Sequence, residues 1–362
     1  MQKKIKCGVI GAGWWATFAH IPALLTHPNA ELVAIQNNDP VEAQRISRDF
    51  GIPIACSTTA ELLAIEDLSA VVISSSPNLH FADATATLSQ GKHLLIEKPM
   101  THTAAQAARL VQLADEHQSV FLMSCPWHYT VHGTEARRLI RSGALGKIRL
   151  ISVLMTNPIN HLLRGIDTAP THGTSAPYMH PRMRTYSDPA IAGGGQVYAQ
   201  VSHAAAYLTF LTGARPQEVF ARFHNDGAAI DIYDAITLRM DDSSIVTIAS
   251  TGATSLDRKD FEVRVFGTDG MLFLDLWNGR LEFVPMSGPS TLYPDLDRDA
   301  IYPHQAPANN LIDSILDPSR NQSPAIYGLA AMEVIEGASR SAASGQNISV
   351  ASLLENQTRQ HA

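Results

Sequence analysis

Residues 5–16 read IKCGVIGAGWWA, an apolar strand-like run that ends in the pattern GxGxxA at Gly11, Gly13 and Ala16. In a strand–turn–helix unit the first glycine permits the tight turn, and the second lets the backbone approach a pyrophosphate. The small third residue lets the helix pack closely on the strand, while free N–H groups at the helix N-terminus bind the anion. A tight turn can require glycine without any ligand, but residues 5–36 contain the whole strand–turn–helix–strand order. The stretch therefore predicts a dinucleotide-binding site.

Strands and helices continue to alternate over the first third of the chain. The expected strands are residues 5–10, 31–36, 70–74, 93–96 and 120–124, and the expected helices are residues 40–50, 79–90 and 103–117. This alternation indicates βαβ units and a doubly wound parallel sheet with helices on both faces. Thr101 or Thr103 would cap the last of these helices, since a hydroxyl satisfies free N–H groups at a helix start. We assign residues 1–125 to an α/β Rossmann domain that binds a dinucleotide.

The tripeptide Glu97-Lys98-Pro99 closes the apolar run at residues 94–96. A side chain at the carboxyl end of a parallel strand points into the crevice where such sheets bind ligands. Beside a dinucleotide, the Lys98 ammonium could hold a substrate hydroxyl or help to deprotonate it. Taken alone, the tripeptide is more simply a solvated lysine before a helix-starting proline, so its interpretation depends on the rest of the chain.

The pattern changes after Cys125. A helix and a strand are followed by a loop rich in Pro, Gly, His and Arg, then by one helix, a series of alternating strands and two late helices. These segments are residues 134–142, 148–156, 157–195, the helix from 196, strands 218–224, 233–240, 244–250 and 261–267 with a turn at 241–242, and helices 309–316 and 326–343. Alternation at period two indicates an antiparallel sheet with one covered face. We expect an α+β domain with a large, open, mostly antiparallel sheet at residues 126–345, followed by a C-terminal tail at 346–362.

Length and composition exclude several classes of protein. A chain of 362 residues fits two domains, and 45% hydrophobic with 17% charged residues is an ordinary globular composition. The net charge of -7, with no Lys/Arg cluster, argues against nucleic-acid and anionic-membrane partners. No apolar run approaches the roughly 18 residues of a membrane span, and the N-terminus leads into a strand rather than a signal-peptide core. A cytoplasmic enzyme without a membrane or nucleic-acid partner fits these observations.

Neither the cysteines nor the histidines show metal-ligand spacing. Cys7 and Cys125 lie in apolar strand-like runs and are expected to be buried free thiols, and Cys56 is far from both. The histidines that invite attention are His20, His80, His128, His161, His172 and His180. We expect them to be polar groups of loops and pockets, and we predict no metal.

The end of the second expected strand bears on the choice between NAD and NADP. An acidic residue there commonly hydrogen-bonds the 2′-hydroxyl of the adenosine ribose. Asn37 occupies this position in the run Asn37-Asn38-Asp39, and an amide can bond a ribose hydroxyl without repelling a 2′-phosphate. The nearest basic residue that could neutralise such a phosphate is Arg45. The sequence therefore favours NAD over NADP and leaves both open.

The helix after Gly193-Gly194-Gly195 carries two stripes. One is apolar, at core spacing, and consists of Val197, Val201, Ala204, Leu208 and Leu211. The other is polar but uncharged, and consists of Gln196, Gln200, His203 and Tyr207. Because solvated helix faces are usually charged, the second stripe indicates either a pocket wall or a face against a neighbouring subunit. In a pocket, His203 is a credible general base, since imidazole can accept a hydroxyl proton near neutral pH as hydride leaves.

Four motifs in this order resemble the glucose–fructose oxidoreductase / inositol dehydrogenase family, over nearly the whole chain. They are GAGWWA at 11–16, the loop from Ser75-Ser76-Pro77 to His80, Glu97-Lys98-Pro99, and Gly193–Gly195 followed eight residues later by His203. The resemblance implies a Rossmann domain and a second domain whose open sheet forms a homodimer or homotetramer interface. It also implies hydride transfer between a nicotinamide and a carbinol carbon of a sugar, polyol, sugar lactone or glycoside. Lys98 matches the EKP lysine of the family, and His203 matches its acid/base histidine.

The site residues that we expect follow from these motifs and from the loop at 157–195. For the cofactor they are Gly11, Gly13, Trp14, Trp15, Asn37, Asn38, Ser75, Ser76, Pro77, His80 and Glu97. For a small carbohydrate substrate they are Gln196, Gln200, His128, Arg164, Tyr178 and Arg182, with His161, His172, His180 and Arg184 in the same loop. Arginines there could bind a carboxylate or a hydroxyl-dense ring, and they could equally be surface charges or oligomer contacts.

One departure from the family pattern leaves other functions open. Family members often carry Asp four residues before the histidine, and here that position is Ala199. Its loss removes an acceptor and leaves His203 less biased towards its protonated form, so Gln200 or Tyr198 could hold the substrate instead. One alternative is a glycosidase-like enzyme that oxidises a sugar transiently, eliminates the aglycone and returns the hydride. Another is a non-catalytic sugar or nucleotide sensor, against which the presence of both Lys98 and His203 argues.

Overall fold

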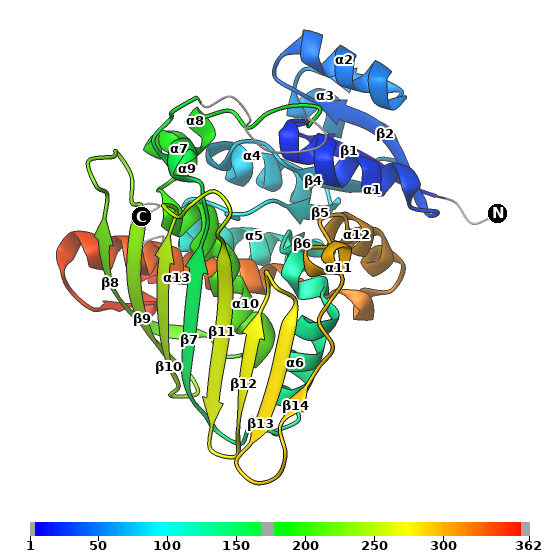
Figure 1. Cartoon of the computed structure of the whole chain (residues 1–362). Helices are drawn as coiled ribbons and strands as arrows, with labels where there is room; N and C mark the ends of the chain where they lie inside the picture. The colour runs from blue at the N-terminus through cyan, green and yellow to red at the C-terminus, as the bar shows by residue number, and fades with distance from the viewer. Residues whose placement is uncertain (1–3, 168–176, 356–362) are drawn as a thin grey trace.

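Six parallel strands form the first sheet of the structure, a computed structural model that describes residues 4–167 and 177–355 (Figure 1). Their order across the sheet is β3–β2–β1–β4–β5–β6, which confirms the predicted doubly wound sheet. The strands are β1 Ile5–Ile10, β2 Ala30–Gln36, β3 Ile54–Cys56, β4 Ala70–Ile73, β5 His93–Ile96 and β6 Phe121–Met123. The sequence missed β3, because three residues are too few to show a period. The order reverses between β1 and β4, where open α/β sheets bind their ligands.

Helices connect these strands and are capped where the sequence allows it. They are α1 Ile21–Thr26, α2 Pro40–Phe50, α3 Thr59–Leu63, α4 Pro77–Leu88 and α5 Ala104–Glu116, with a π-helical turn η1, Ala16–His20, after the glycine turn. Asp39 caps α2, since its Oδ1 accepts from the N–H of Val41 at 2.9 Å. Thr103 caps α5 by accepting from the N–H of Gln106 at 3.2 Å, so of the two candidate threonines Thr103 is the cap.

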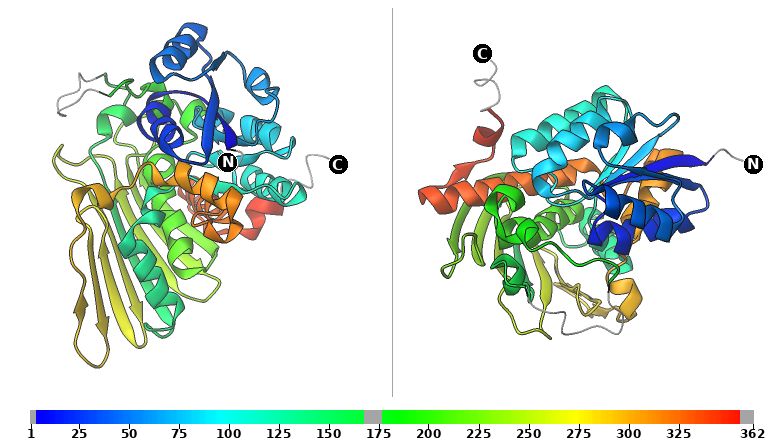
Figure 2. Two further views of the ribbon diagram at one scale, coloured as in Figure 1. Left: turned by 90° about the vertical axis from the view of Figure 1, so that its right-hand side faces the viewer. Right: turned by 90° about the horizontal axis from the view of Figure 1, so that it is seen from above.

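Helix α12, Ala306–Leu316, returns from the far end of the chain to pack against the first sheet. Leu311 and Ile312 are fully buried in the same core as Val72 of β4 and Leu95 of β5. Figure 2 shows this orange helix beside the blue strands. A segment that the sequence assigns to the second domain thus completes the core of the first sheet.

Nine strands form the second sheet, in the order β14–β13–β12–β11–β7–β10–β9–β8–β15. Only β7 and β10 pair in parallel, so the predicted mostly antiparallel sheet is confirmed. The strands are β7 Ile148–Thr156, β8 Pro216–His224, β9 Tyr233–Met240, β10 Ile245–Thr251, β11 Asp260–Gly267, β12 Gly270–Asp275, β13 Arg280–Pro285, β14 Thr291–Leu292 and β15 Ile348–Ser349. The sequence missed β12 to β15. Strand β15 and helix α14, Ala351–Glu355, lie within the segment that we expected to be a tail.

One face of the second sheet is covered by helices, and the other is open (Figures 1 and 2). The cover consists of α6 Val131–Arg141, α10 Ser202–Thr212 and α13 Ala325–Ser344. Along β9 buried and exposed residues alternate strictly, as the period-two pattern predicts for a sheet covered on one side. Helix α6 begins earlier than expected because Thr130 caps it, accepting from the N–H of Gly133 at 3.0 Å. The open face carries Leu150, Leu154, Phe220, Tyr233 and Ile245, all more than a third exposed.

The segment at 157–195, expected as a loop, contains three single-turn helices in its described part. These are α7 Asn160–Leu163, α8 Arg184–Ser187 and α9 Pro189–Ala192. The remaining short elements are η2 Pro126–Tyr129, the π-helical turn η3 Val197–Val201, α11 Arg298–Ile301 and η4 Pro318–Arg320. None of the helices within residues 4–167 and 177–355 is long and apolar enough to span a membrane.

Candidate active site

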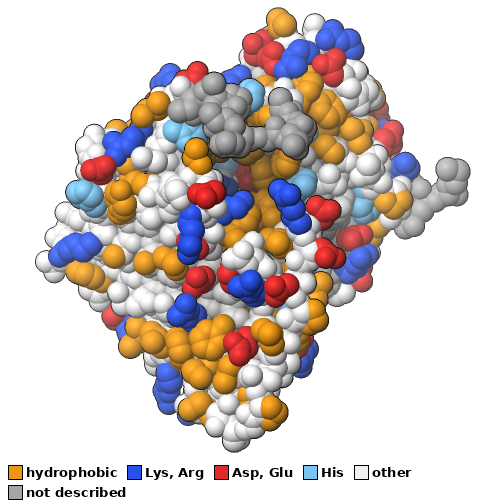
Figure 3. All heavy atoms as spheres, in the orientation of Figure 1, with side chains coloured by type: hydrophobic (Ala, Val, Ile, Leu, Met, Phe, Trp, Pro, Cys, Tyr) orange, Lys and Arg blue, Asp and Glu red, His pale blue; other side chains and the backbone are white. Residues whose placement is uncertain are grey.

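A cavity of about 500 Å³ lies where the carboxyl ends of the first sheet meet the second half of the chain. Its lining comes from the turns after β1, β2, β4, β5 and β6 on one side and from the segment around η3 on the other. Figure 3 shows the molecule hollowed in this region, with hydrophobic side chains inside and Lys or Arg side chains at the mouth. This is the crevice in which the strand order predicts a ligand.

The glycine turn at the bottom of the cavity is shaped for a close approach. Gly11 has a φ of +76°, and a Cβ on it would lie 2.3 Å from the backbone of Ser75. Its N–H donates to Oε1 of Gln36 at 3.0 Å, which fixes the turn to the end of β2. A Cβ on Gly13, by contrast, would meet nothing closer than the Gly11 carbonyl at 3.8 Å. The space above Gly13 is therefore free for a phosphate, and these residues fit a dinucleotide.

The two asparagines after β2 differ in what they can offer. Asn37 is buried; its Nδ2 donates to the Ala12 carbonyl at 2.9 Å and its Oδ1 accepts from the N–H of Asp39 at 3.0 Å. Its amide thus braces the glycine turn. Asn38 is exposed and lines the cavity, and its Oδ1 accepts from Nε2 of Gln36 at 2.7 Å. Of the pair, Asn38 has groups left for a ribose.

The loop after β4 brings Ser75, Ser76 and Pro77 to the cavity wall, but His80 lies behind them. The ring of His80 is buried between the carbonyl of Pro99, 2.8 Å from Nδ1, and the carbonyl of Ser75, 3.0 Å from Nε2. Burial lowers the pKa of His80, against the opposing effect of these two carbonyls. His80 thus ties the loop after β4 to the loop that carries Lys98, and does not itself line the cavity.

Glu97 is held by a network that sequence reasoning missed. Its Oε1 accepts from Nε1 of Trp15 at 2.8 Å and lies 2.8 Å from Nε2 of the fully buried His20. Burial alone would raise the pKa of Glu97, but the hydrogen bond and charge of His20, together with Ser124 and Lys98, outweigh it and the pKa falls below its ordinary value. The carboxylate therefore stays ionised and fixes the turn before Lys98. The only feature of the sequence that could have indicated this network is the position of His20, a few residues after the glycine turn.

Lys98 reaches across the cavity to the second half of the chain. Its Nζ donates to the carbonyl of Ala199, in the π-helical turn η3, at 2.9 Å. Burial lowers the pKa of Lys98 below its ordinary value, and the charge of Glu97 partly opposes the shift. π-Helical turns occur frequently at functional sites. Residue 199 is often Asp in the family that the sequence resembles. Here it is Ala199, which contacts Lys98 through its backbone oxygen.

His203 lies on the same cavity wall and is 4% exposed. Its Nδ1 is 4.0 Å from Sγ of Cys125, and its ring centroid is 5.1 Å from that of Trp127. Burial, reinforced by the positive charge of Lys98, lowers the pKa of His203 well below 6.5. The imidazole is therefore neutral at physiological pH and can accept a proton.

The π-helical turn changes which side of the helix faces the cavity. Gln200 and His203 line it, as the polar stripe predicts, but Gln196 does not. The side chain of Gln196 is fully buried and donates to Asn157 at 3.2 Å and to Ser250 at 2.9 Å. Tyr207 is fully buried as well. The extra residue in the π turn rotates the positions before and after it, so the α-helical spacing assumed for the stripe holds only in its middle.

The other expected substrate residues are scattered. Arg182 lines the cavity. His128 is fully buried and stacks on Phe210, with ring centroids 4.5 Å apart. Arg164 pairs with Asp226 at 2.6 Å, outside the lining, and Tyr178 donates to Asp49 of α2 at 2.7 Å. His172 lies outside the described residues, as residues 168–176 all do.

Aromatic residues of the second half form a wall that the sequence did not reveal. The rings of Trp127, Trp277 and Tyr302 contact one another, with centroids 4.6 to 5.5 Å apart, and all three line the cavity. The ammonium of Lys259 lies over Trp277, 3.7 Å from the ring centroid. These residues come from three distant segments, which no local pattern joins. Within the described ranges, no three His, Cys, Asp or Glu side chains converge in a way that would hold a metal.

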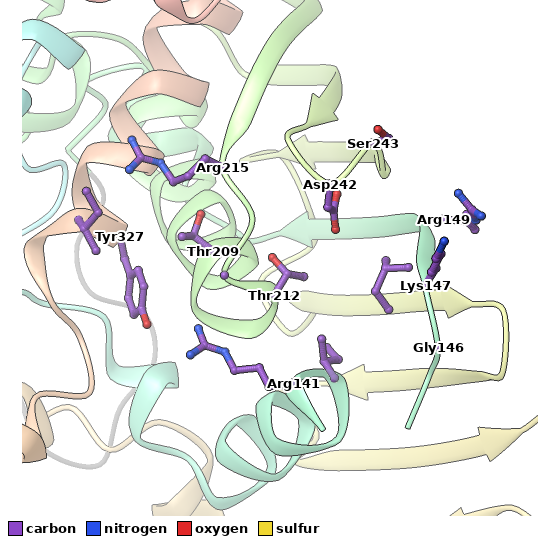
Figure 4. A pocket seen from close by; sticks show the side chains of 14 residues that line it. Arg141, Gly146, Lys147, Arg149, Thr209, Thr212, Arg215, Asp242, Ser243 and Tyr327 are labelled. Carbon is purple, nitrogen blue, oxygen red and sulfur yellow. The ribbon is translucent and has the colours of Figure 1, made fainter. Parts of the chain in front are cut away.

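A second hollow, of about 1100 Å³, lies at the far end of α10 (Figure 4). Arg141 and Arg215 sit at one end of it, but both have partners in the protein. Arg141 donates to the Phe210 carbonyl at 3.3 Å, and Arg215 pairs with Glu333 at 2.6 Å. The hollow contains neither Lys98 nor His203, so the smaller cavity is the candidate active site.

Known protein families show the same two-part organisation. The family described as "Oxidoreductase family, NAD-binding Rossmann fold" matches residues 5–124, and the "GFO/IDH/MocA C-terminal domain" matches residues 134–273. The chain belongs to the GFO/IDH/MocA oxidoreductase family. This confirms the resemblance carried by the four motifs. The description also confirms that the first domain of this family member is of the kind that binds NAD.

Among curated relatives, dTDP-3,4-didehydro-2,6-dideoxy-alpha-D-glucose 3-reductase of Streptomyces antibioticus is 33% identical over 156 residues. The match covers 43% of this chain and 47% of that protein. The chain thus spans about half the length of the first curated relatives it matches.

Solved structures show the same fold over nearly the whole chain. GenD2 from gentamicin A biosynthesis, in complex with NAD, is 20% identical with a TM-score of 0.77, covering 96% of this chain and 97% of that one. Levoglucosan dehydrogenase, in complex with NADH and levoglucosan, is 17% identical with a TM-score of 0.80, covering 96% and 100%. At these identities the likeness shows the architecture of this GFO/IDH/MocA member alone.

Proposed function

We propose that this protein is an NAD-dependent dehydrogenase that oxidises a carbinol carbon of a sugar, polyol, sugar lactone or glycoside. The observation that carries the proposal is the meeting of Lys98 and His203 from opposite sides of the cavity. Lys98 bonds the Ala199 carbonyl, four residues before His203, and its charge contributes to the low pKa of that histidine. The named dehydrogenases and reductases among the relatives support the same class of reaction.

His203 and Lys98 would act together on the hydroxyl group of the substrate. His203 uses Nδ1 towards Cys125, so its Nε2 is the nitrogen left for a substrate hydroxyl. As a neutral imidazole it accepts the hydroxyl proton, a step that contributes about 10²- to 10⁴-fold in rate in comparable enzymes. The Lys98 ammonium donates to the same oxygen and stabilises the negative charge that develops on it. Bound nicotinamide supplies the acceptor for the hydride that leaves the carbinol carbon.

The first domain would hold the dinucleotide through backbone groups. Gly11 and Gly13 admit the pyrophosphate, Trp14, Trp15, Ser75, Ser76 and Pro77 line its side of the cavity, and Asn38 offers its amide to a ribose. Arg45, the basic residue nearest to the end of β2, donates to Glu42 at 2.7 Å and stacks on Tyr178. Because Arg45 already has partners, we propose NAD as the preferred cofactor. His80 and Glu97 would act by holding the two loops in place.

Nicotinamide absorbance tests the proposal directly. Purified protein is mixed with NAD or NADP and a panel of sugars, polyols, lactones and glycosides that includes the acidic members of these classes. The proposal expects net reduction of NAD by one class of these substrates, with NADP a poorer acceptor. Dinucleotide binding without reduction by any substrate would contradict it. Release of aglycone with catalytic NAD would instead identify transient oxidation and elimination.

We also propose that the open face of the second sheet joins two copies of the chain. Leu150 and Leu154 of β7, Phe220 of β8 and Ile245 of β10 expose apolar surface on that face, and contiguous patches of this kind mark interfaces. Light scattering should give at least a dimer for the natural chain. Phe220→Glu should shift it towards monomer, whereas Val131→Glu, at a still more exposed valine of α6 on the covered side, should not. A monomeric natural chain would contradict the proposal.

A further inference from the structure

Lys259 is a cation at the cavity wall for which the described chain provides no anion. It directly precedes β11 and lines the cavity together with Trp277, which follows β12. Since β11 and β12 are antiparallel neighbours, the start of β11 and the end of β12 lie side by side, and the two residues meet at the same end of the sheet. No ion pair or hydrogen bond of Lys259 occurs within residues 4–167 and 177–355. The adjacent carboxylate of Asp260 accepts instead from Thr156 at 2.8 Å and pairs with Arg258.

The ring of Trp277 covers one side of this ammonium. Nζ of Lys259 lies 3.7 Å from the ring centroid, within the range of a cation–π contact. Such a contact holds the ammonium in place without neutralising its charge. Burial, together with the charge of Arg298, lowers the pKa of Lys259, so an anion bound beside it would stabilise its charged form.

The other charged groups of the cavity leave it net positive at the substrate end. Its cations are Lys98, Arg182 and Lys259, and its carboxylates are Asp83 and Glu97. Asp83 accepts from the hydroxyl of Thr59, at the start of α3, at 2.7 Å and from that of Ser75, after β4, at 2.8 Å. Glu97 is held by Trp15 and His20. Both carboxylates thus serve the first domain, and neither is bonded to Lys259.

Aromatic rings connect Lys259 to the proposed proton acceptor. Trp277 contacts Trp127, with centroids 5.1 Å apart, and Trp127 contacts His203 at the same centroid distance. Two rings therefore separate the ammonium from the imidazole. A ring-shaped substrate lying along this wall would have its apolar face on the indoles, its reacting hydroxyl at His203 and its far substituent at Lys259.

We propose that the substrate carries a carboxylate and that Lys259 binds it, so the substrate class is acidic: a uronate, an aldonate or another carboxylated polyol. A single ammonium matches the single charge of a carboxylate. The inference rests on the proposed function, because it takes this cavity as the substrate site. Lys259 then determines specificity by favouring acids over the matching neutral sugars.

Calorimetric titration of the protein saturated with NADH tests the inference without requiring turnover. Glucuronate, galacturonate, mannuronate and the corresponding aldonates are each compared with the matching neutral aldose. One acid should bind roughly 10- to 100-fold more tightly than its aldose, as expected for a hydrogen bond to a charged group. In Lys259→Met that preference should vanish, in Lys259→Arg it should largely return, and in Lys147→Met, at an exposed lysine at the other end of the sheet, it should persist.

Two results separate this inference from the proposed function. If no acid binds more tightly than its aldose, or if Lys259→Met weakens acid and aldose equally, the acidic class is wrong even where neutral sugars reduce NAD. If acid binding depends on Lys259 but no substrate reduces NAD, the inference stands and the dehydrogenase is wrong.

Discussion

The two ends of the cavity are built in different ways. At the first-domain end, Gly11, Gln36 and Asn37 are joined to one another or to the backbone, so the glycine turn beside the cavity is fixed by contacts inside the domain. At the other end, the wall consists of large side chains, above all Trp277 and Lys259, with few polar contacts inside the protein. A glycine turn fixed in this way suits a ligand that many proteins share, whereas a wall of large side chains can be changed by single substitutions. We therefore expect the second end to determine the substrate specificity of this protein.

The largest effect should come from His203, which lies on the wall formed by the second half of the chain. His203→Leu removes the proposed proton acceptor and should lower kcat by about 10²- to 10⁴-fold. Because His203 belongs to the second end, the dissociation constant of NAD should change little. Turnover and NAD affinity are measured side by side; an equal loss of both would mean that the histidine supports the fold and not the reaction.

Two glycines of the first end should separate fold stability from cofactor binding. Gly11→Ala adds a Cβ 2.3 Å from the Ser75 backbone at a φ of +76°, so it should cost about 1–3 kcal/mol and lower Tm by several degrees. Gly13→Ala meets no protein atom closer than 3.8 Å and should leave Tm unchanged while weakening NAD about tenfold or more. The comparison uses thermal unfolding without ligand and NAD titration. If the Gly13→Ala variant binds NAD with normal affinity, the pyrophosphate does not bind next to Gly13.

Ala199 allows the electrostatics of the second end to be altered. Ala199→Asp would place a carboxylate next to Lys98 and His203, and a nearby negative charge favours the protonated form of both. Their pKa values, both held below the ordinary values by burial, should rise. Both limbs of the pH profile of kcat/KM should then move to higher pH, by about one pH unit. Ala199→Asn is the uncharged control. If its pH profile of kcat/KM moves as far as that of Ala199→Asp, the shift is not an effect of charge.

The smallest effect should come from the aromatic wall. Trp277→Leu removes ring stacking and the support of Lys259, and should raise KM about two- to tenfold with kcat nearly unchanged. Trp277→Phe should restore most of the affinity. If KM stays the same in Trp277→Leu, the substrate does not lie along this wall.

The same contrast explains what the sequence could predict. Gly11, Gly13, Ser75 and Lys98 all follow strands, and the carboxyl ends of parallel strands meet at one edge, so local patterns brought them together correctly. Trp277 and Lys259 follow and precede strands of an antiparallel sheet, whose pairing decides which ends meet, and β12 was not recognised. The π turn at 197–201 likewise displaced Gln196 from the predicted stripe, since helix type is not visible in hydrophobic spacing.

The missed contacts of the first end have a related cause. His20 was seen as one of many histidines, and its bond to Glu97 joins residues 77 positions apart. Asn37 was expected to face the ribose, but its amide braces the glycine turn. The position of Asn37 at the end of a strand was predicted, but the direction of its side chain depended on partners elsewhere, and no pattern in the sequence linked His20 to Glu97.

Lys98 joins the two ends of the cavity, so its replacement tests the account most directly. We would measure nicotinamide reduction by the natural chain and by Lys98→Met with the best substrate of the panel, and NAD binding to both. The account predicts a loss of turnover of about 10²- to 10⁴-fold in Lys98→Met with NAD affinity retained. Turnover by Lys98→Met at the rate of the natural chain would contradict it.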